Sequence, residues 1–369
     1  MTGKLIDSFG RHIDYVRLSV TDRCNLRCFY CLPERHRCVS HKQQRLNDDE
    51  LVRLLAIFTG LGISKVRLTG GEPLVRRDLT VLAARLMRLP GLSDLSLSTN
   101  GMLLSKLAPA LRRAGVARLN VSLDTLRPER FASITRGGRL EEVLAGLRSA
   151  QAAGFRPIRI NMLALKGFNE DEFEDMVRFC VEHDFTLRLI EPMPVGDPGR
   201  AGTGHYLDLQ AVKQRLSATY RLTPSTLADG GPARYYRING TSAHIGFITA
   251  LSRHFCQSCN RVRLSAEGTL YLCLGQNDKA ELGPLLRRGA NDEDLGRSRA
   301  RHPRGRGTQT GTTCLPRASR AGDPLHVHDR RLAWCRPPSA SVKTRIWCPP
   351  CCPSAGFRAS ALRDHGIAV

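Results

Sequence analysis

Two kinds of sequence period alternate between residues 15 and 190, and together they restrict the fold more than any other feature. Six short runs alternate apolar and polar residues, as strands do. They are Tyr15–Val20, Lys65–Thr69, Leu95–Thr99, Ala117–Leu123, Ile158–Leu163 and Thr186–Ile190. Longer runs between them repeat apolar residues at helical spacing. Alternating strands and helices are typical of a parallel sheet, so the sequence predicts an α/β fold.

The predicted helices each carry one apolar stripe. The first spans residues 47–60, where Asn47 and Glu50 form a capping-box pattern. The three stripes are Leu51, Leu54, Leu55 and Phe58; Leu140, Val143, Leu144 and Leu147; and Phe173, Met176, Val177 and Cys180. Because Cys180 lies on such a stripe, its expected role is packing.

The polar positions of the strands predict an unusual barrel interior. Apolar residues of each strand must face the helices, which turns the polar set inward. That inward set includes four arginines: Arg17, Arg67, Arg159 and Arg188. A closed eight-stranded barrel is instead filled with branched apolar side chains. We therefore expect an open or partial barrel around an anionic ligand, although single arginines could pair with Asp124 or Glu191.

Three cysteines follow the first predicted strand in a CxxxCxxC array: Cys24, Cys28 and Cys31. Thiolates at this spacing on one loop can converge on a single soft metal centre. A structural zinc ion requires a fourth ligand, for which His12, His36 and Cys38 are the candidates. A 4Fe-4S cluster needs only three, which leaves its fourth iron free for another ligand. The spacing favours the cluster.

A second set of three cysteines comprises Cys256, Cys259 and Cys273. A zinc knuckle completed by His254 is one interpretation. A second cluster with an open iron is favoured, because the chain already offers one such array. Arg261 and Arg263 follow on one face of a predicted strand and would lie beside that iron. The chain holds 13 cysteines and no recognisable signal peptide, which argues for metal chemistry over disulfides.

A glycine pair follows the second predicted strand in Thr69-Gly70-Gly71-Glu72-Pro73. Glycine lets a ligand approach the backbone closely. With the CxxxCxxC array on the preceding strand, this pattern resembles the radical S-adenosylmethionine enzymes. The resemblance implies a partial (β/α)6 TIM-like barrel, a 4Fe-4S cluster on Cys24, Cys28 and Cys31, and S-adenosylmethionine on its open iron. Residues Tyr30, Gly71, Ser122 and Met193 would line the S-adenosylmethionine site.

A closer resemblance covers residues 4–294 and rests on both cysteine arrays, CNRVRL and Ile190-Glu191-Pro192-Met193. It is to the branch of this family that opens molybdenum cofactor biosynthesis. It implies a lyase that removes the ribose 3′ hydrogen of GTP and joins that carbon to guanine C8, giving (8S)-3′,8-cyclo-7,8-dihydroguanosine 5′-triphosphate. A second 4Fe-4S cluster on Cys256, Cys259 and Cys273 would bind the guanine. The implied GTP contacts are Arg17, Arg67, Ser98, Arg159, Arg261, Val262 and Arg263.

The same resemblance implies the partners of the reaction. The electron donor would be a reduced protein of the ferredoxin or flavodoxin type, and a cyclic pyranopterin monophosphate synthase would act downstream. No apolar run is long enough to cross a membrane, so we expect a cytoplasmic enzyme. The formal net charge of +22 does not by itself indicate nucleic acid, because residues 295–369 carry 14 Lys and Arg but 3 Asp and Glu.

The composition predicts three regions. Residues 1–195 would form the barrel, and residues 196–294 a smaller α+β region with the second cluster. Residues 295–369 hold 8 of the 20 prolines and no sustained apolar period, so we expect a disordered basic tail. The composition changes abruptly at about residue 295. This suggests that residues 295–369 are an out-of-frame product and that the family's Gly-Gly ending is missing. The alternative function is therefore a folded homologue that binds clusters, S-adenosylmethionine or GTP without turnover.

Overall fold

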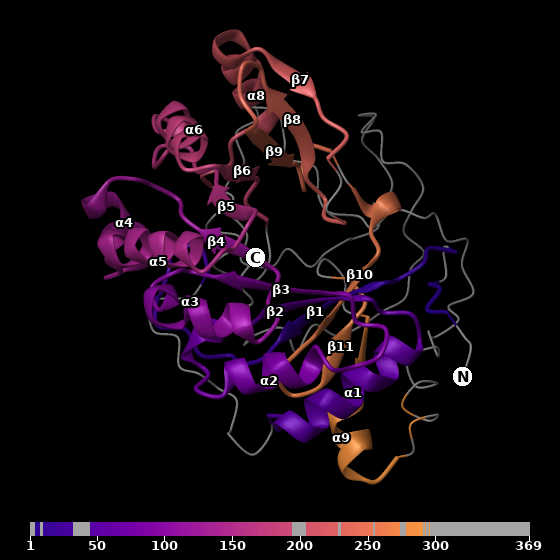
Figure 1. Cartoon of the computed structure of the whole chain (residues 1–369). Helices are drawn as coiled ribbons and strands as arrows, with labels where there is room; N and C mark the ends of the chain where they lie inside the picture. The colour runs from indigo at the N-terminus through magenta and orange to yellow at the C-terminus, as the bar shows by residue number, and fades with distance from the viewer. Residues whose placement is uncertain are drawn as a thin grey trace, which may run out of the picture.

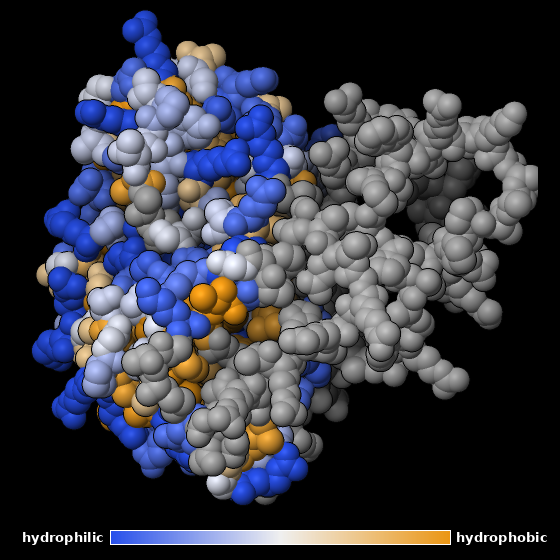
Figure 2. Space-filling model, turned by 90° about the vertical axis from the view of Figure 1, so that its right-hand side faces the viewer, coloured by the Kyte–Doolittle hydropathy of each residue, from blue (hydrophilic) through white to orange (hydrophobic). Residues whose placement is uncertain are grey.

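The computed structural model describes residues 4–7, 10–31, 45–193, 204–227, 230–253, 255–273 and 278–290, together with Asp292 and Leu295. These residues form one 12-stranded sheet with the order β12-β11-β10-β1-β2-β3-β4-β5-β6-β9-β8-β7. The sheet is curved and open, and most of the helices lie along one side of it (Figure 1). Polar side chains predominate on the face seen in Figure 2, where apolar ones appear in separate places.

The six predicted strands are confirmed, with ends that shift by at most one residue. They are β1 (Tyr15–Ser19), β2 (Lys65–Thr69), β3 (Asp94–Thr99), β4 (Arg118–Ser122), β5 (Ile158–Leu163) and β6 (Phe185–Ile190). Each pairs in parallel with the next. This is the partial TIM-like arrangement expected from the alternating periods.

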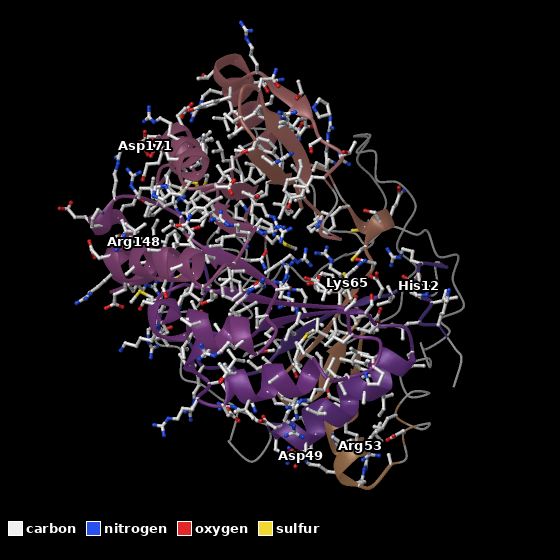
Figure 3. The ribbon with its side chains drawn as sticks, viewed as in Figure 1. His12, Asp49, Arg53, Lys65, Arg148 and Asp171 are labelled. Atoms are coloured by element: carbon white, nitrogen blue, oxygen red, sulfur yellow. The ribbon has the colours of Figure 1, made fainter. Side chains whose placement is uncertain are left out.

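Helices connect these strands. They are α1 (Asp48–Gly60), α2 (Leu79–Leu86), α3 (Leu104–Arg113), α4 (Pro128–Thr135), α5 (Leu140–Ala152) and α6 (Phe173–Glu182), with the short 3-10 helix η2 (Pro73–Val75) after β2. The capping box at Asn47 and Glu50 is confirmed. Charged residues such as Asp49, Arg53, Arg148 and Asp171 lie on the outside (Figure 3).

Later elements extend both edges of the sheet. Helix α8 (Leu209–Tyr220) precedes β7 (Leu222–Pro224), β8 (Arg234–Ile238) and β9 (His244–Ile248). Then follow η3 (Cys256–Ser258), β10 (Arg261–Leu264), β11 (Thr269–Tyr271), β12 (Lys279–Glu281) and α9 (Leu282–Arg287). Strands β8 and β9 form an antiparallel hairpin around Asn239-Gly240, and β10 pairs in antiparallel with β11.

The sequence did not indicate that β9 and β10 continue the parallel array. Strand β9 pairs in parallel with β6 at one edge, and β10 pairs in parallel with β1 at the other. Eight parallel strands therefore stand side by side, and the chain between β9 and β10 connects the two edges of this array. Strands from both sides of residue 195 share one sheet, so the boundary at 195 stays a prediction.

The core lies between the sheet and the helices. Val16 and Leu18 of β1 are fully buried there, while Arg17 between them points to the other face. The stripe of α6 is confirmed, since Phe173, Met176, Val177 and Cys180 are all buried. Cys180 is a packing residue, and burial raises the pKa of its thiol. Within the described residues, no helix is both long and apolar enough to cross a membrane.

Candidate active site

The loop of the first cysteine set follows β1 and is held from both sides by backbone hydrogen bonds. On one side, the N–H of Gly71 donates to the carbonyl of Thr21 at 2.9 Å, and the N–H of Glu72 to that of Arg23 at 2.7 Å. On the other, the N–H of Arg27 donates to the carbonyl of Thr135 at 3.1 Å. The loop is thus fixed at the C-terminal ends of the strands.

The glycine pair allows this backbone contact. A Cβ at Gly71 would lie 2.4 Å from the carbonyl oxygen of Arg23, and a Cβ at Gly70 would lie 2.3 Å from that of Thr21. Gly70 also has a φ of +151°, which side chains other than glycine rarely adopt. The sequence predicted close approach by a ligand, and the structure shows close approach by the cysteine loop itself.

Glu72 connects this loop to β3, and sequence reasoning gave it no role. Its carboxylate accepts hydrogen bonds from the Thr99 hydroxyl at 2.7 Å and the Asn100 N–H at 2.6 Å. The Asn100 side chain in turn donates to Asn25 Oδ1 at 2.8 Å, inside the cysteine loop. Burial raises the pKa of Glu72 to about 7, although these hydrogen bonds oppose the shift. The sequence feature that could have pointed to Glu72 is a carboxylate directly after the glycine pair.

The three thiols of this loop are free and close enough to influence one another. Burial raises the pKa of all three. For Cys31 the pKa reaches about 12, raised next by the charge of Cys24. Cys31 and Cys24 also raise the pKa of Cys28, after burial and Asp124. Hydrogen bonds from Leu26 and Asn100 to Cys24 and from Tyr30 to Cys28 only partly oppose these shifts. Buried neighbouring thiols fit a cationic iron cluster, which would deprotonate them.

No tight single-ion site accompanies these thiols. Within the described residues, no group of three or more His, Cys, Asp and Glu side chains is close enough to hold one metal ion. His12 precedes β1, whereas Cys24 follows it, so His12 lies at the other end of the strand. His36, Cys38 and His254, the other candidate zinc ligands, lie outside the described residues.

The four residues expected at the S-adenosylmethionine site all lie at or beyond the C-terminal ends of parallel strands. Tyr30 is in the cysteine loop, Gly71 follows β2, Ser122 ends β4 and Met193 follows β6. The Tyr30 hydroxyl donates to Asp124 Oδ2 at 2.6 Å. Burial raises the pKa of Asp124 to about 6, although that hydrogen bond lowers it, and burial also raises the pKa of Tyr30. All four thus lie at the C-terminal ends of the strands, while their role stays a prediction.

Three arginines form a row across the adjacent strands β10, β1 and β2, at one side of the parallel array. Arg17 on β1 is in register with Arg67 on β2 and with Arg263 on β10. Burial lowers the pKa of Arg17 well below its ordinary value, and the charges of Arg263 and Arg67 lower it further. Burial and the charge of Arg261 lower the pKa of Arg263 to about 10. Like charges this close favour a bound anion.

Several buried polar atoms on this face have no hydrogen-bond partner among the described residues. They are Arg17 Nε, Arg263 Nη1, the Tyr15 hydroxyl and Asn161 Oδ1. An unsatisfied buried donor costs roughly 1 to 3 kcal/mol. The Arg67 guanidinium lies 5.4 Å from the centroid of the Tyr15 ring. These groups fit a polar, anionic molecule in the barrel.

The remaining inward residues lie in neighbouring rows. Ser98 on β3 and Arg159 on β5 are both in register with Asn120 of β4, between them. Arg188 donates to the Tyr235 hydroxyl at 2.6 Å and to Asn120 Oδ1 at 2.9 Å. Tyr235 and Asn120 were not identified from the sequence, because each contact joins distant strands.

The two carboxylates considered as arginine partners hydrogen-bond to other groups. Asp124 accepts from Tyr30 and from the Leu163 N–H at 2.8 Å. Glu191 accepts from the Leu251 N–H at 2.8 Å and the Ser252 hydroxyl at 2.5 Å. These bonds fix loops at the edge of the sheet, which explains the burial of both acids.

The second cysteine set lies at the N-terminal ends of the parallel strands, whereas the first lies at their C-terminal ends. Cys256 and Cys259 precede β10, whose first residue pairs with the first residue of β1. Cys273 follows β11, and continuing the antiparallel register brings it level with Arg261. Strand β10 therefore enters the sheet with Cys256 and Cys259 at its N-terminal end.

Of the three residues on β10 that were expected to contact GTP, Arg261 and Arg263 share the polar face. Val262 between them is 7% exposed and packs in the main hydrophobic core. Its side chain faces away from the arginines, so a contact with a ligand in the barrel would involve its backbone alone.

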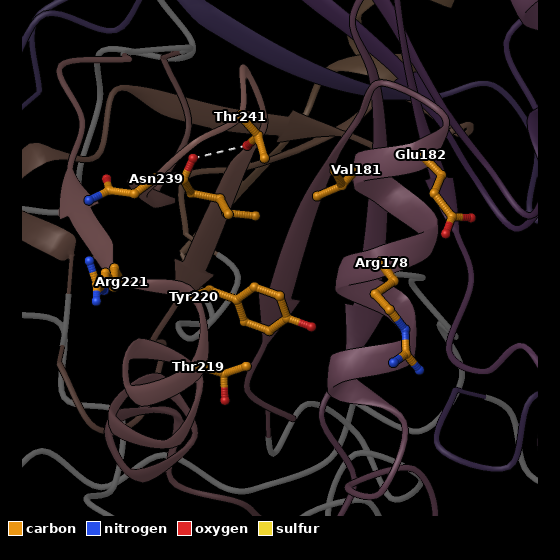
Figure 4. Close-up of a pocket in the computed structure, with 9 residues that line it drawn as sticks. Arg178, Val181, Glu182, Thr219, Tyr220, Arg221, Asn239 and Thr241 are labelled. Atoms are coloured by element: carbon orange, nitrogen blue, oxygen red, sulfur yellow. Dashed lines mark hydrogen bonds between the residues drawn. The ribbon is translucent and has the colours of Figure 1, made fainter.

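A separate groove of about 320 Å³ lies between the ends of α6 and α8 and the β8–β9 hairpin (Figure 4). It is lined by Arg178, Val181, Glu182, Thr219, Tyr220, Arg221, Ile238, Asn239 and Thr241. None of these residues was a site candidate, and the groove contains neither cysteine set.

Comparison with known proteins agrees with this geometry. Residues 18–180 match the Radical SAM superfamily, and residues 185–308 match Molybdenum Cofactor Synthesis C, which extends past the end of the recognised resemblance at 294. The chain resembles Streptococcus suis SuiB, solved bound to S-adenosylmethionine, with a TM-score of 0.56 at 15% identity, covering 78% of this chain and 68% of SuiB. That likeness supports the fold.

Two curated relatives are much more similar in sequence. The GTP 3′,8-cyclase of Hydrogenovibrio crunogenus is 47% identical over 79% of this chain and 89% of its own length. That of Paracoccus denitrificans is 49% identical over 79% of this chain and 85% of its own length. The chain therefore belongs to the GTP 3′,8-cyclase family of the radical SAM superfamily.

Proposed function

We propose that this chain is a lyase that converts GTP to (8S)-3′,8-cyclo-7,8-dihydroguanosine 5′-triphosphate, early in molybdenum cofactor biosynthesis. The observation that carries the proposal is the position of the arginine row. Arg17, Arg67 and Arg263 lie at the level between two sets of three cysteines, one after the C-terminal end of β1 and one before the N-terminal end of β10. A substrate held there would face a different metal centre at each end.

Cys24, Cys28 and Cys31 would hold one 4Fe-4S cluster, with Tyr30, Gly71, Ser122 and Met193 around its S-adenosylmethionine. When bound and reduced, this pair supplies the 5′-deoxyadenosyl radical that takes the 3′ hydrogen of GTP. Hydrogen bonds from Gly71 and Glu72 to the cysteine loop hold the thiols in place. Asp124 orients the Tyr30 ring through its hydroxyl.

The arginine row would bind the triphosphate. Three guanidiniums in adjacent strands provide the donor forks that suit phosphate oxygens, and a polyanion would relieve their mutual repulsion. Ser98, Arg159, Arg261 and the backbone at Val262 would complete the GTP site. The charge of the row orders the nucleotide, so that its phosphates lie between the two edges.

A small apolar cluster would keep water from the reacting sugar. Leu163, Leu165 and Ile190 are buried together, with the partly buried Phe29 and Phe168 packed against them. The rings of Phe29 and Phe168 stack at 4.8 Å between centroids. This cluster borders Tyr30 and so flanks the end of the barrel where the radical would form.

Cys256, Cys259 and Cys273 would hold the second 4Fe-4S cluster, whose open iron binds the guanine. Arg261 and Arg263 follow directly on β10 and would approach the nucleotide from that side. We propose a reduced ferredoxin or flavodoxin-type protein as electron donor, and the cyclic pyranopterin monophosphate synthase as the enzyme that consumes the product. The proposed location is the cytoplasm.

The test is an anaerobic assay of protein reconstituted with iron and sulfide. It measures 5′-deoxyadenosine and nucleotide products with S-adenosylmethionine and a chemical reductant, with and without GTP. GTP-stimulated release together with a cyclised nucleotide is the expected result. Release of 5′-deoxyadenosine without a cyclised nucleotide would contradict the proposed reaction, and ATP in place of GTP serves as the control substrate.

A further inference from the structure

The N-terminal segment, of which residues 4–7 and 10–14 are described, contacts the loop of the second cysteine set at two points. Arg11 Nη1 donates a hydrogen bond to the backbone carbonyl of Cys256. Asp14 Oδ1 accepts one from the Asn260 side chain at 2.5 Å. Asn260 directly follows Cys259, so the two contacts flank the CxxC motif. The proposed reaction assigns no role to either residue of the segment.

The segment itself is well anchored. Leu5 and Ile13 are buried in the main core at 3% and 6% exposure. The Leu5 N–H donates to the Leu61 carbonyl at 3.0 Å, and the Ile13 N–H to the Leu5 carbonyl at 2.8 Å. Its two halves also pair through a bridge between Ile6 and His12. A contact from this segment therefore ties the cysteine loop to the barrel.

Each contacting side chain is oriented by a partner of opposite charge. Arg11 Nε donates to Asp7 Oδ2 at 2.6 Å, and Asp7 Oδ1 accepts from the Arg11 N–H at 2.9 Å. Asp14 Oδ2 accepts from Lys65 Nζ at 2.9 Å. Lys65 is the first residue of β2, and it is labelled with His12 in Figure 3. Paired charges hold both side chains in one rotamer better than solvent would.

The cysteine loop has little structure of its own to define it. Between β9 and β10, the described residues contain one regular element, the three-residue η3. The loop also spans the two edges of the parallel array, so neither neighbouring strand fixes its middle. A cluster with an open iron needs that iron at a constant place relative to Arg261 and Arg263 if it is to present a base correctly.

We infer that Arg11 and Asp14 are positioning residues for the second cluster. This inference rests on the proposed function. Arg11 holds the loop at Cys256, and Asp14 holds it at Asn260. The second cluster would then keep its place at the N-terminal ends of the strands. The guanine would stay aligned with the triphosphate on the arginine row. Neither residue touches the first cysteine set, so S-adenosylmethionine cleavage in the absence of GTP does not depend on them.

The test compares Arg11→Ala, Arg11→Lys and Asp14→Ala with the control Arg53→Ala. Arg53 is a close match for Arg11, because it also joins an early element to a late backbone carbonyl, Ala290 O at 2.8 Å, and pairs with Asp292. Each change is made in the full chain. Each is also made in a chain whose Cys24, Cys28 and Cys31 are alanine, so that all bound iron belongs to the second cluster.

In the second background, iron loss to bathophenanthroline should be at least fivefold faster with Arg11→Ala or Asp14→Ala, and within twofold of the parent with Arg53→Ala. In the full chain, the KM for GTP should rise at least tenfold, with GTP-independent 5′-deoxyadenosine release unchanged. Arg11→Lys keeps a hydrogen-bond donor. Its increases in iron-loss rate and in KM for GTP should therefore be at most half of those of Arg11→Ala on a logarithmic scale.

Two results would overturn the inference. One is an unchanged iron-loss rate and an unchanged KM in both alanine variants. The other is an equal loss of GTP-independent 5′-deoxyadenosine release, which would make the segment a general support of the fold. If the parent chain with intact Cys256, Cys259 and Cys273 binds no second cluster, the proposed function fails first, and the assay shows this before any variant is compared.

Discussion

Arg17 of β1 and Arg263 of β10 are register partners in adjacent parallel strands, although they are 246 positions apart in the sequence. The charge of Arg263 lowers the pKa of Arg17, in addition to the effect of burial. Two buried guanidiniums side by side destabilise the empty barrel and favour an anion between them. This pair therefore links the stability of the protein to its proposed substrate.

Replacing Arg17 with methionine tests that link. We expect the KM for GTP to rise about 10- to 100-fold, because a hydrogen bond to a charged group contributes roughly 1.5 to 3 kcal/mol. The ligand-free variant should melt at a higher temperature than the parent, since a buried like-charge contact is removed. Steady-state kinetics and calorimetry measure the two effects. Arg53→Met is the surface control, and an unchanged KM would contradict the assignment of the row.

Gly71→Ala tests the close contact between the glycine pair and the cysteine loop. The new Cβ would lie 2.4 Å from the Arg23 carbonyl oxygen, so the loop must move. We expect the iron retained by the first cysteine set to fall at least twofold, measured per chain after reconstitution. Gly60→Ala is the matched control, because its Cβ meets no atom within 4 Å. Normal iron retention in Gly71→Ala would refute the proposed role of this contact.

Tyr30→Phe removes the hydrogen bond that lowers the pKa of Asp124. In the folded chain that pKa is about 6, above the ordinary 3.8, so the folded state binds the proton more tightly. Stability therefore falls as pH rises from about 4 to 6. Without the Tyr30 hydroxyl the pKa rises further, and the fall extends above pH 6.

Denaturant unfolding of cluster-free protein measures this effect. At pH 8 the Tyr30→Phe variant should be less stable than the parent by about 1 to 3 kcal/mol, with a smaller difference at pH 5. Tyr271→Phe, at a half-buried tyrosine on β11, is the control. A pH-independent difference would show that Asp124 is not the group involved.

Cluster assembly on the first cysteine set should depend steeply on pH. Burial raises the pKa of Cys24, Cys28 and Cys31, with Cys31 at about 12, and iron binds the thiolate form. Below such a pKa, the thiolate fraction rises about tenfold per pH unit for each thiol. Anaerobic reconstitution should therefore be at least tenfold faster at pH 9 than at pH 7, measured by iron uptake in a chain with Cys256, Cys259 and Cys273 replaced by alanine. Equal rates at both pH values would contradict burial of the thiols.

Local sequence determined a large part of this protein. The period-2 runs located six strands to within one residue, because each strand buries one face against helices and leaves the other polar. The spacing of Cys24, Cys28 and Cys31 predicts a metal-binding loop, since three thiols on one short segment can reach one another. Strand side chains alternate between the two faces of a sheet, so the sequence also predicted which arginines share the inner face. Those arginines indicated an anionic ligand.

Tertiary structure decided how these parts meet. Glu72 and Asn100 were missed because they hydrogen-bond to each other from separate strand ends, and Asn100 bonds to Asn25 in the cysteine loop, which is distant in sequence. The pairing of β10 with β1 was missed because parallel strands carry no turn that records their partner. That one pairing brings Arg263 beside Arg17. It also places the second cysteine set at the N-terminal ends of the strands, whereas the first set lies at their C-terminal ends. The sequence alone determined which groups the chain offers, whereas long-range strand pairing determined which of them lie side by side, as Arg17 and Arg263 do.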